Sequence, residues 1–171
     1  MVRFVTRRFI SEYINDRHTC YEHNAVYSNG DNQPFEILDL SNPVLQLAQD
    51  EKTEKNFENQ IKWGDVFMLM YSTVDRPSFN EISRLAFLIN FLHKCSAAKP
   101  IVTLVGTKTD LVEQRTVTSL EGRRLAESLG ARFYEVSSRE GYKKIEDAFR
   151  ESADLSRFSL IQVMATQILK I

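Results

Sequence analysis

Runs of hydrophobic residues along the chain predict where it forms buried strands. Three runs are almost uniformly apolar, which is typical of parallel strands covered on both faces; they span residues 65–71, 100–105 and 132–136. Two further strand-like runs, 19–27 and 34–40, flank the pair Asn29-Gly30, which favours the tight turn of a hairpin. The pattern therefore predicts a sheet of parallel strands with one hairpin at its edge.

Apolar residues at helical spacing predict helices between these strands. One such face follows Pro77-Ser78 and consists of Phe79, Ile82, Leu85, Ala86, Ile89 and Leu92. Thr118 and Glu121 have the spacing of a capping box, and Gly130 is placed to end that helix. A last helix follows Gly141, with an apolar face of Tyr142, Ile145, Ala148 and Phe149. Alternating strands and helices predict an α/β domain: a mainly parallel sheet, one antiparallel edge strand, and helices on both faces.

The two ends and one internal segment have less certain patterns. Val2, Val5, Phe9 and Ile10 fall at helical spacing, so we expect the chain to begin inside a helix that no capping residue precedes. Residues 44–62 are polar and weakly patterned, and they fit either a loop or a short helix.

Residues 1–155 are expected to form the domain, and residues 156–171 an amphipathic tail. The apolar positions of the tail recur at three- and four-residue steps; they are Phe158, Ile161, Met164 (or Ala165), Ile168 and Ile171. This spacing predicts a helix that Ser156 or Ser159 could cap. The helix either packs on its own domain or docks on a partner, a membrane surface or an open sheet edge.

The composition of the chain disfavours general binding to nucleic acid or to anionic lipid. Charged residues make up 26% of the chain, the net charge is -1 and the pI is about 6.3, so nothing attracts it generally to nucleic acid or anionic lipid. Cys20 and Cys95 lack metal-type spacing and are expected to be reduced thiols. The C-terminus has no prenylation cysteine. We therefore expect a cytoplasmic protein, at most peripheral to a membrane, without a lipid anchor.

Polar residues follow the predicted parallel strands at their carboxyl ends, where ligands bind in such sheets. Thr107, Lys108 and Asp110 follow the run that ends at residue 105. A carboxylate there can accept hydrogen bonds from the adjacent N1 and N2 donors of guanine, each worth about 1.5–3 kcal/mol. The Lys108 stem can lie across the face of a base. An ordinary loop rich in Lys and Asp is the alternative interpretation.

Two further loops could belong to the same site. Ser137-Ser138-Arg139 follows the next strand, and its backbone N–H groups could contact the same base or simply begin a helix. Asp39 ends the second hairpin strand and suits a magnesium-bound water, although an aspartate that starts a turn is commoner. Each signal is weak when it is taken alone.

Taken together, these loops resemble the Ras superfamily of small GTPases in order and spacing. The resemblance is strongest to the subgroup of the Ras-related oestrogen-regulated growth inhibitor and the Ras-like 11 and 12 proteins. The matching segments are residues 2–13, 37–39, 75–79, 105–111 and 134–142. The resemblance implies a Ras-like P-loop NTPase fold, binding of GTP or GDP with magnesium, and a role in signal transduction through effector or regulatory proteins that the sequence does not identify.

The resemblance also assigns roles to individual residues. It matches Thr107, Lys108 and Asp110 to the [Asn/Thr]-Lys-x-Asp base motif, and Ser137, Ser138 and Arg139 to the Ser-Ala-Lys motif. It matches Phe9 to the aromatic residue that packs against guanine, Tyr13 to a switch-one tyrosine, and Asp39 to an aspartate that holds magnesium through water.

The departures from the family concern the phosphate end of the site. No Gly-Lys pair occurs in the 171 residues, so the Gly-x-x-x-x-Gly-Lys-[Ser/Thr] loop that cradles phosphates is absent from this sequence. Asp16 stands in place of a magnesium-ligating threonine, and Asn42 in place of a glycine. Pro43 stands in place of the water-positioning glutamine and lacks both a side-chain amide and a backbone N–H. We therefore expect no catalytic residue and weak nucleotide binding.

The missing loop follows a strand that is central in the family's sheet. Without it, we expect the strands that end at Asp39 and Tyr71 to have unpaired inner edges. Two functions remain open: a guanine-nucleotide-binding switch with at most slow hydrolysis, or a pseudo-GTPase that serves as a non-enzymatic interaction module. An unrelated α/β enzyme is disfavoured because no Gly-x-Ser-x-Gly or Cys–His arrangement stands out.

Overall fold

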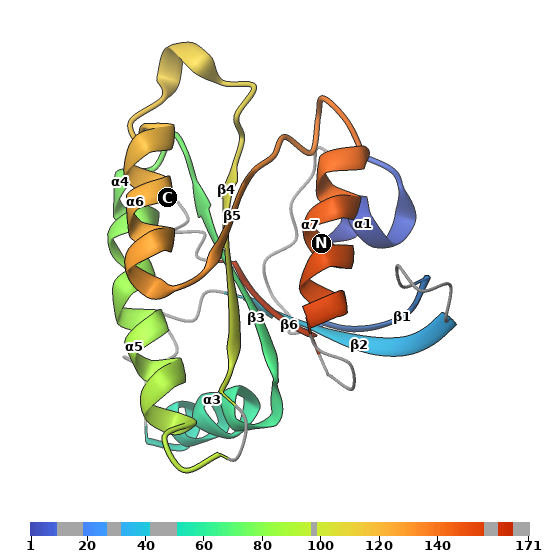
Figure 1. The fold of residues 1–171 in the computed structure, drawn as a ribbon, viewed down its shortest axis with the longest axis vertical. Coiled ribbons are helices and arrows are strands. Elements are labelled where there is room, and N and C mark those ends of the chain that lie inside the picture. Colours follow the sequence, from blue (N-terminus) through green and yellow to red (C-terminus); the bar gives the residue numbers. More distant parts are fainter. Residues whose placement is uncertain (10–18, 27–31, 42–50, 97–98, 156–160, 166–171) are drawn as a thin grey trace.

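The computed structural model describes residues 1–9, 19–26, 32–41, 51–96, 99–155 and 161–165, and Figure 1 shows the fold they form. The strands are β1 (Thr19–Val26), β2 (Asn32–Ser41), β3 (Val66–Ser72), β4 (Ile101–Thr107), β5 (Arg132–Glu135) and β6 (Ile161–Ala165). The helices are α1 (Val2–Thr6), α3 (Glu51–Trp63), α4 (Arg76–Asn80), α5 (Ile82–Leu92), α6 (Ser119–Leu129) and α7 (Lys143–Leu155), with a 3-10 turn at Val112–Gln114.

The strands form one six-stranded sheet in the order β1-β2-β6-β3-β4-β5. β1 pairs with β2 antiparallel at one edge, and every other neighbouring pair is parallel. This arrangement confirms the predicted α/β class, with its parallel sheet and single antiparallel edge strand. It also confirms that β4 and β5, the strands before the two loops predicted to read the base, are parallel neighbours. The Asn29-Gly30 turn lies outside the described residues.

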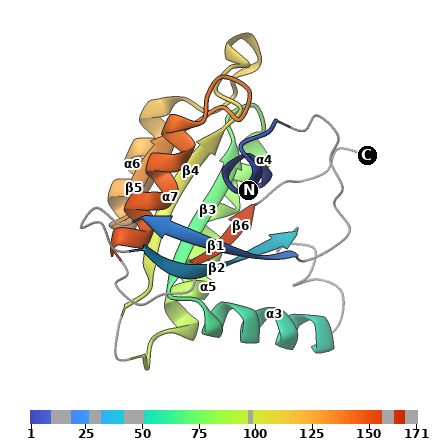
Figure 2. The same ribbon diagram turned by 90° about the vertical axis from the view of Figure 1, so that its right-hand side faces the viewer.

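The tail was predicted to be a helix, and this prediction is wrong for residues 161–165. They form β6, which lies between β2 and β3 and pairs with both in parallel (Figure 2). Val163 is level with Asp39 on one side and with Met68 on the other. The predicted open edges of β2 and β3 are therefore covered, because the tail supplies the strand between them. The remaining tail positions named above lie outside the described residues.

Two hydrophobic cores cover the two faces of the sheet, and β3 contributes to both. Val66 and Met68 face the core beneath α1 and α7, whereas Phe67, Leu69 and Tyr71 face the core beneath α3, α5 and α6. All five are at most 1% exposed. This two-sided burial explains why the run is apolar without alternation. Figure 1 shows α1 and α7 on one side of the sheet and α4, α5 and α6 on the other.

Some helices begin and end where the sequence predicted, and others do not. The Thr118–Glu121 capping box is formed, and Gly130 ends α6 with a φ of 63°. The helix after Pro77 is divided at Glu81 into α4 and α5, and the polar segment 44–62 becomes a helix from Glu51 onward. α1 ends at Thr6, so Phe9 lies beyond it. Within the described part of the chain, no helix is long and apolar enough to cross a membrane.

Candidate functional site

The loop after β4 is held in a fixed shape by the neighbouring strand β3. The hydroxyl of Thr107 donates to the Tyr71 carbonyl at 2.8 Å. The Thr73 hydroxyl lies 3.0 Å from the Thr107 carbonyl and 3.2 Å from the Lys108 carbonyl. Lys108 has a φ of 61° and an exposed side chain. Thr73 was not identified from the sequence, because a hydroxyl that supports a loop of a different strand leaves no local pattern.

The structure brings the two predicted base-reading loops into contact. Ser137 donates a hydrogen bond from its hydroxyl to Oδ1 of Asp110 at 2.7 Å. The same hydroxyl oxygen accepts from the backbone N–H groups of Arg139 at 3.0 Å and Glu140 at 3.2 Å. Ser137 is only 5% exposed, so water competes little for these bonds. Ser138 and Arg139 have exposed side chains on the same loop.

Phe9 lies at the end of the segment that α1 begins. α1 is anchored by Phe4, whose ring stacks on Phe149 of α7 with centroids 4.1 Å apart. Beyond the helix, the Arg7 guanidinium lies 5.1 Å from the ring centroid of Tyr142. Phe9 follows two residues later, and its ring is 49% exposed. An exposed phenylalanine at this position is available to a ligand.

Asp39 does not lie at the carboxyl ends of β4 and β5, where the base loops begin, but several residues further back along the strand direction. It is level with Met68 through β6, and Met68 is level with Thr103, which precedes Thr107 on β4. Burial lowers the pKa of the Met1 amino group, and the nearby Asp39 carboxylate opposes that shift. Among the residues the structure describes, no three His, Cys, Asp or Glu side chains gather into a metal site. One carboxylate fits magnesium only if phosphate oxygens and waters complete the shell.

A network of hydrogen bonds that includes the ion pair of Arg76 and Glu121 supports the loop after β4. Arg76 donates to both carboxylate oxygens of Glu121, at 2.7 and 3.2 Å, and also to the Thr116 carbonyl. Hydrogen bonds from Arg76, and then from the backbone and hydroxyl of Thr118, lower the pKa of Glu121 to about 2. The backbone N–H of Thr116 in turn donates to the Thr73 carbonyl at 2.9 Å. The network thus links α4 and α6 to the residue that holds the Lys108 loop.

Tyr71 fills the space beneath the same loop. Its ring is 1% exposed, and burial is the largest of the causes that raise the pKa of its hydroxyl. A Cβ on Gly106 would lie 2.9 Å from this hydroxyl, and one on Gly122 only 2.4 Å. The close approach of Tyr71 to β4 and α6 therefore requires glycine at both positions.

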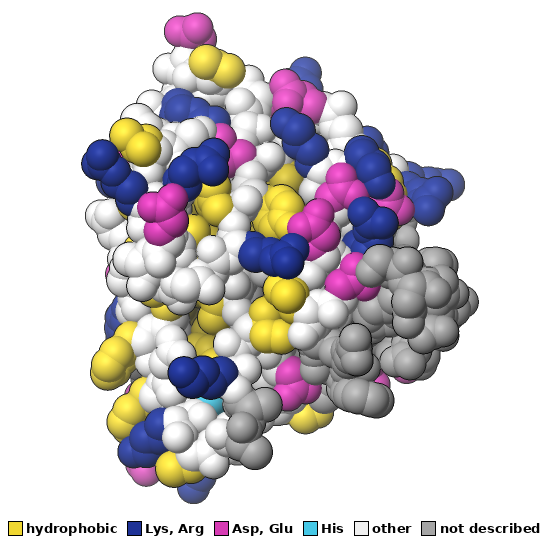
Figure 3. All heavy atoms as spheres, in the orientation of Figure 1, with side chains coloured by type: hydrophobic (Ala, Val, Ile, Leu, Met, Phe, Trp, Pro, Cys, Tyr) yellow, Lys and Arg dark blue, Asp and Glu magenta, His cyan; other side chains and the backbone are white. Residues whose placement is uncertain are grey.

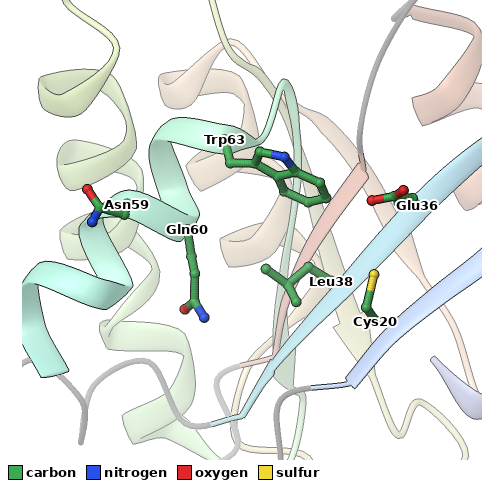
Figure 4. A pocket seen from close by; sticks show the side chains of 6 residues that line it. All are labelled: Cys20, Glu36, Leu38, Asn59, Gln60 and Trp63. Atoms are coloured by element: carbon green, nitrogen blue, oxygen red, sulfur yellow. The ribbon is translucent and has the colours of Figure 1, made fainter.

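A groove of about 380 Å³ lies away from these loops, between the β1–β2 hairpin and α3 (Figure 4). Its lining consists of Cys20, Glu36, Leu38, Asn59, Gln60 and Trp63. Burial raises the pKa of the Cys20 thiol, and the carboxylates of Glu36 and Glu22 raise it further. The thiol is therefore a weak nucleophile at neutral pH. The groove shares no residue with the base loops, so it does not belong to the candidate nucleotide site.

Most of the chain is similar in sequence to known proteins of one family. The model of the Ras family matches residues 1–157. The human Ras-related and estrogen-regulated growth inhibitor is 34% identical over 151 residues, which are 88% of this chain and 70% of that protein. Ras-like protein family member 11B of Danio rerio is 33% identical over 159 residues, 92% of this chain and 63% of that protein. Ras-like protein family member 11A of Rattus norvegicus is 34% identical over 150 residues, 88% and 61% respectively.

Proposed function

The chain belongs to the Ras family, and we propose that it recognises a guanine base through the two loops that meet at Asp110 and Ser137. Members of this family are small GTP-binding signalling proteins. The finer assignment, which part of the nucleotide these residues hold, rests on the geometry of the two loops.

The hydrogen bond between Ser137 and Asp110 is the observation that carries the proposal. An ionised carboxylate has about four acceptor positions, and Ser137 occupies one of them at Oδ1. The remaining positions suit the adjacent N1 and N2 donors of guanine. Adenine offers no such pair of donors and would leave the carboxylate unpaired, which costs about 1–3 kcal/mol or more. The site therefore favours guanine over adenine.

Lys108 and Phe9 are proposed to cover the base. Lys108 has a left-handed backbone and an exposed side chain, so its apolar stem is free to lie along one face of a purine. Phe9 offers an exposed ring for an edge contact. Ser138 and Arg139 have exposed side chains on the Ser137 loop, and they are proposed to contact the same base.

The phosphate end is proposed to bind weakly and to support no hydrolysis in these 171 residues. Asp39 would hold magnesium through water, and the ion would supply charge neutralisation for phosphate oxygens when it is bound. Asp39 is the carboxylate beside the Met1 amino group, and no Gly-Lys pair occurs in the sequence. Asp16, Asn42 and Pro43, which depart from the family at the phosphate end, lie outside the described residues.

A second candidate function is a pseudo-GTPase that acts only as an interaction module. Asn42 and Pro43 favour it, because proline offers neither of the groups that could orient an attacking water. The two candidates differ in whether the base loops still bind guanine. Both retain the fold.

Ligand-observed NMR with GMP and AMP tests the proposed function at the affinities expected here. GMP should show saturation transfer from the protein, AMP much less, and Asp110→Ala should abolish the difference. Glu113→Ala, which removes an exposed carboxylate three residues further along, serves as the matched control and should behave as the unaltered chain. Equal transfer to GMP and AMP, or no effect of Asp110→Ala, would leave only the interaction module.

A further inference from the structure

α5 has hydrophobic residues on its outer face as well as on its inner face. The inner face is buried against the sheet and consists of Ile82, Leu85, Ala86 and Ile89. On the outer face, Phe87 is 71% exposed and Phe91 is 51% exposed. A surface helix normally presents polar residues on this side. The outer face of α5 therefore combines polar residues (Ser83, Arg84 and Asn90) with two large exposed aromatic rings.

The two exposed rings form one continuous surface. Phe87 and Phe91 are four residues apart, and their centroids lie 6.2 Å apart with an angle of 17° between the ring planes. The ammonium group of Lys94 lies 4.6 Å from the centroid of Phe91. Large aromatic side chains of this kind contribute most of the binding energy in many protein interfaces. We call Phe87 and Phe91, with Arg84 and Lys94, the α5 aromatic surface.

The segment that carries these rings has basic side chains and no acidic ones after Glu81. Residues 82–99 contain Arg84, Lys94 and Lys99 and no aspartate or glutamate. Arg84 is well exposed, and its nearest carboxylate, Glu81, lies 3.8 Å away at the start of the helix. Figure 3 shows hydrophobic side chains at the surface along the left edge, where α5 lies, with Lys or Arg side chains beside them. Electrostatic complementarity therefore favours an acidic partner.

The same charges disfavour a second copy of this chain as the partner. In an antiparallel pair of α5 helices, Arg84 of one copy would face Lys94 of the other. In a parallel pair, each cation would face its own equivalent. Either arrangement places like charges across the interface, which weakens association. The rings of two copies could stack, but their flanking charges would repel.

We propose that the α5 aromatic surface binds an acidic amphipathic helix of a partner protein. Apolar residues of that helix, spaced three or four apart, pack on Phe87 and Phe91. Its carboxylates pair with Arg84 and Lys94 at the two ends of the aromatic pair. The surface lies on the opposite side of the sheet from α1 and α7, so it is separate from the Phe9 segment of the proposed nucleotide site.

A pair of synthetic helical peptides tests this proposal. The first, about 18 residues long, carries leucines along one stripe and glutamates beside them; the second has lysine in place of each glutamate. Fluorescence polarisation should show saturable binding of the acidic peptide and at least about tenfold weaker binding of the basic one. Phe87→Ser with Phe91→Ser should weaken the acidic peptide by about tenfold or more. Leu120→Ser, an equally exposed apolar position on α6, should leave binding unchanged.

Charge reversal gives a second, independent readout. Arg84→Glu with Lys94→Glu should exchange the preference, so that the basic peptide binds better than the acidic one. Circular dichroism should show unchanged folding, since both side chains are exposed. The proposal is overturned if both peptides bind equally, if neither binds at millimolar concentration, or if the chain self-associates through α5 and the acidic peptide does not compete.

Discussion

The Ser137 hydroxyl makes three hydrogen bonds that together shape the base-reading corner. It donates to Asp110 and accepts from the backbone of Arg139 and Glu140. One side chain therefore orients both the Asp110 carboxylate, which we propose reads the base, and its own loop. This dual role makes Ser137 the most informative single position for the proposed function.

We predict that Ser137→Ala weakens guanine binding by on the order of tenfold, because a hydrogen bond to a charged group is worth about 1.5–3 kcal/mol. Without the bond, Asp110 samples several rotamers and pays entropy when it binds the base. NMR titration with GMP measures the change. Ser83→Ala removes an exposed hydroxyl from α5, outside both base loops, and is the matched control. An unchanged GMP affinity in Ser137→Ala would show that Asp110 does not need this partner.

Glu121 gives a prediction about pH. Hydrogen bonds from Arg76 and Thr118 lower the pKa of Glu121 from 4.5 to about 2 in the folded protein. A carboxylate with a lowered pKa stabilises the fold above its unfolded pKa and loses that contribution as the pH falls towards the folded value. The thermal stability of the unaltered chain relative to Glu121→Gln should therefore be constant above about pH 5 and decline between about pH 4.5 and 2.

The size of this effect is limited because Glu121 is exposed, and solvent and salt screen its pair with Arg76. Glu113→Gln, an exposed glutamate of the adjoining loop, should show no comparable difference across the same pH range. A difference for Glu121→Gln that grows as the pH falls would contradict the assigned hydrogen bonds.

At the scale of elements, β6 is the segment that completes the sheet. It pairs with Ile37–Ser41 of β2 and with Val66–Met70 of β3, so five residues of the tail join the hairpin to the rest of the sheet. Helix α7 precedes it and packs on the same face as α1. The strand, helix and strand β5-α7-β6 thus form a parallel crossover over one face of the sheet, from the edge strand β5 to the central strand β6.

We predict that Val163→Pro destabilises the whole domain. Proline cannot donate to a ladder, and it is excluded from strands that have neighbours on both sides. The loss of a buried hydrogen bond, about 1–3 kcal/mol, together with strain should lower the Tm by at least about 5 °C. Val163→Ile keeps the backbone N–H and the β-branched side chain, and should change the Tm little. Equal melting of the proline variant and the unaltered chain would show that β6 does not support the sheet.

The sequence predicted a helix or strand correctly wherever its pattern of residues was compatible with only one of the two. The apolar run at residues 65–71 predicted a strand buried on both faces, and β3 (Val66–Ser72) confirms it. The capping box at Thr118 depends on residues close in sequence and is also confirmed. Ile161–Ala165 was misassigned because a short apolar run fits a helix and a buried strand equally well. The neighbours that decide between them, β2 and β3, are far away in sequence. The role of Thr73 could not be predicted for the same reason, because its hydrogen-bond partners at residues 107 and 108 are also far away in sequence.

The packing of α6 on the sheet gives a further prediction. A Cβ on Gly122 would lie 2.4 Å from the Tyr71 hydroxyl and 2.6 Å from a ring carbon of Phe133. We therefore expect Gly122→Ala to destabilise the fold by about 1–3 kcal/mol through overpacking, although alanine is the better helix former. Gly141→Ala is the control, because no atom lies within 4 Å of a Cβ there. Equal denaturant midpoints for the two variants would contradict the close packing of Tyr71.

Over the whole molecule, the two parts of the proposed nucleotide site lie at different positions along the direction of the parallel strands. The groups that we propose to read the base lie beyond the ends of β4 and β5, where Ser137 donates to Asp110. Asp39 lies lower on the sheet, level with Met68 and Thr103. We propose that a bound nucleotide places its base beside Asp110 and Ser137 and directs its phosphates towards Asp39. We therefore expect the base to supply most of the binding energy.

Isothermal titration calorimetry with guanosine, GMP, GDP and GTP, each with and without magnesium, tests this division most directly. If the base supplies the affinity, the four ligands should bind the 171-residue chain about equally and weakly, in the range of about 0.1–1 mM, and magnesium should change little. Asp110→Ala should weaken all four alike. Nanomolar, magnesium-dependent binding of GTP or GDP, far tighter than guanosine, would contradict the account, because it would require a phosphate site that these residues are not expected to form.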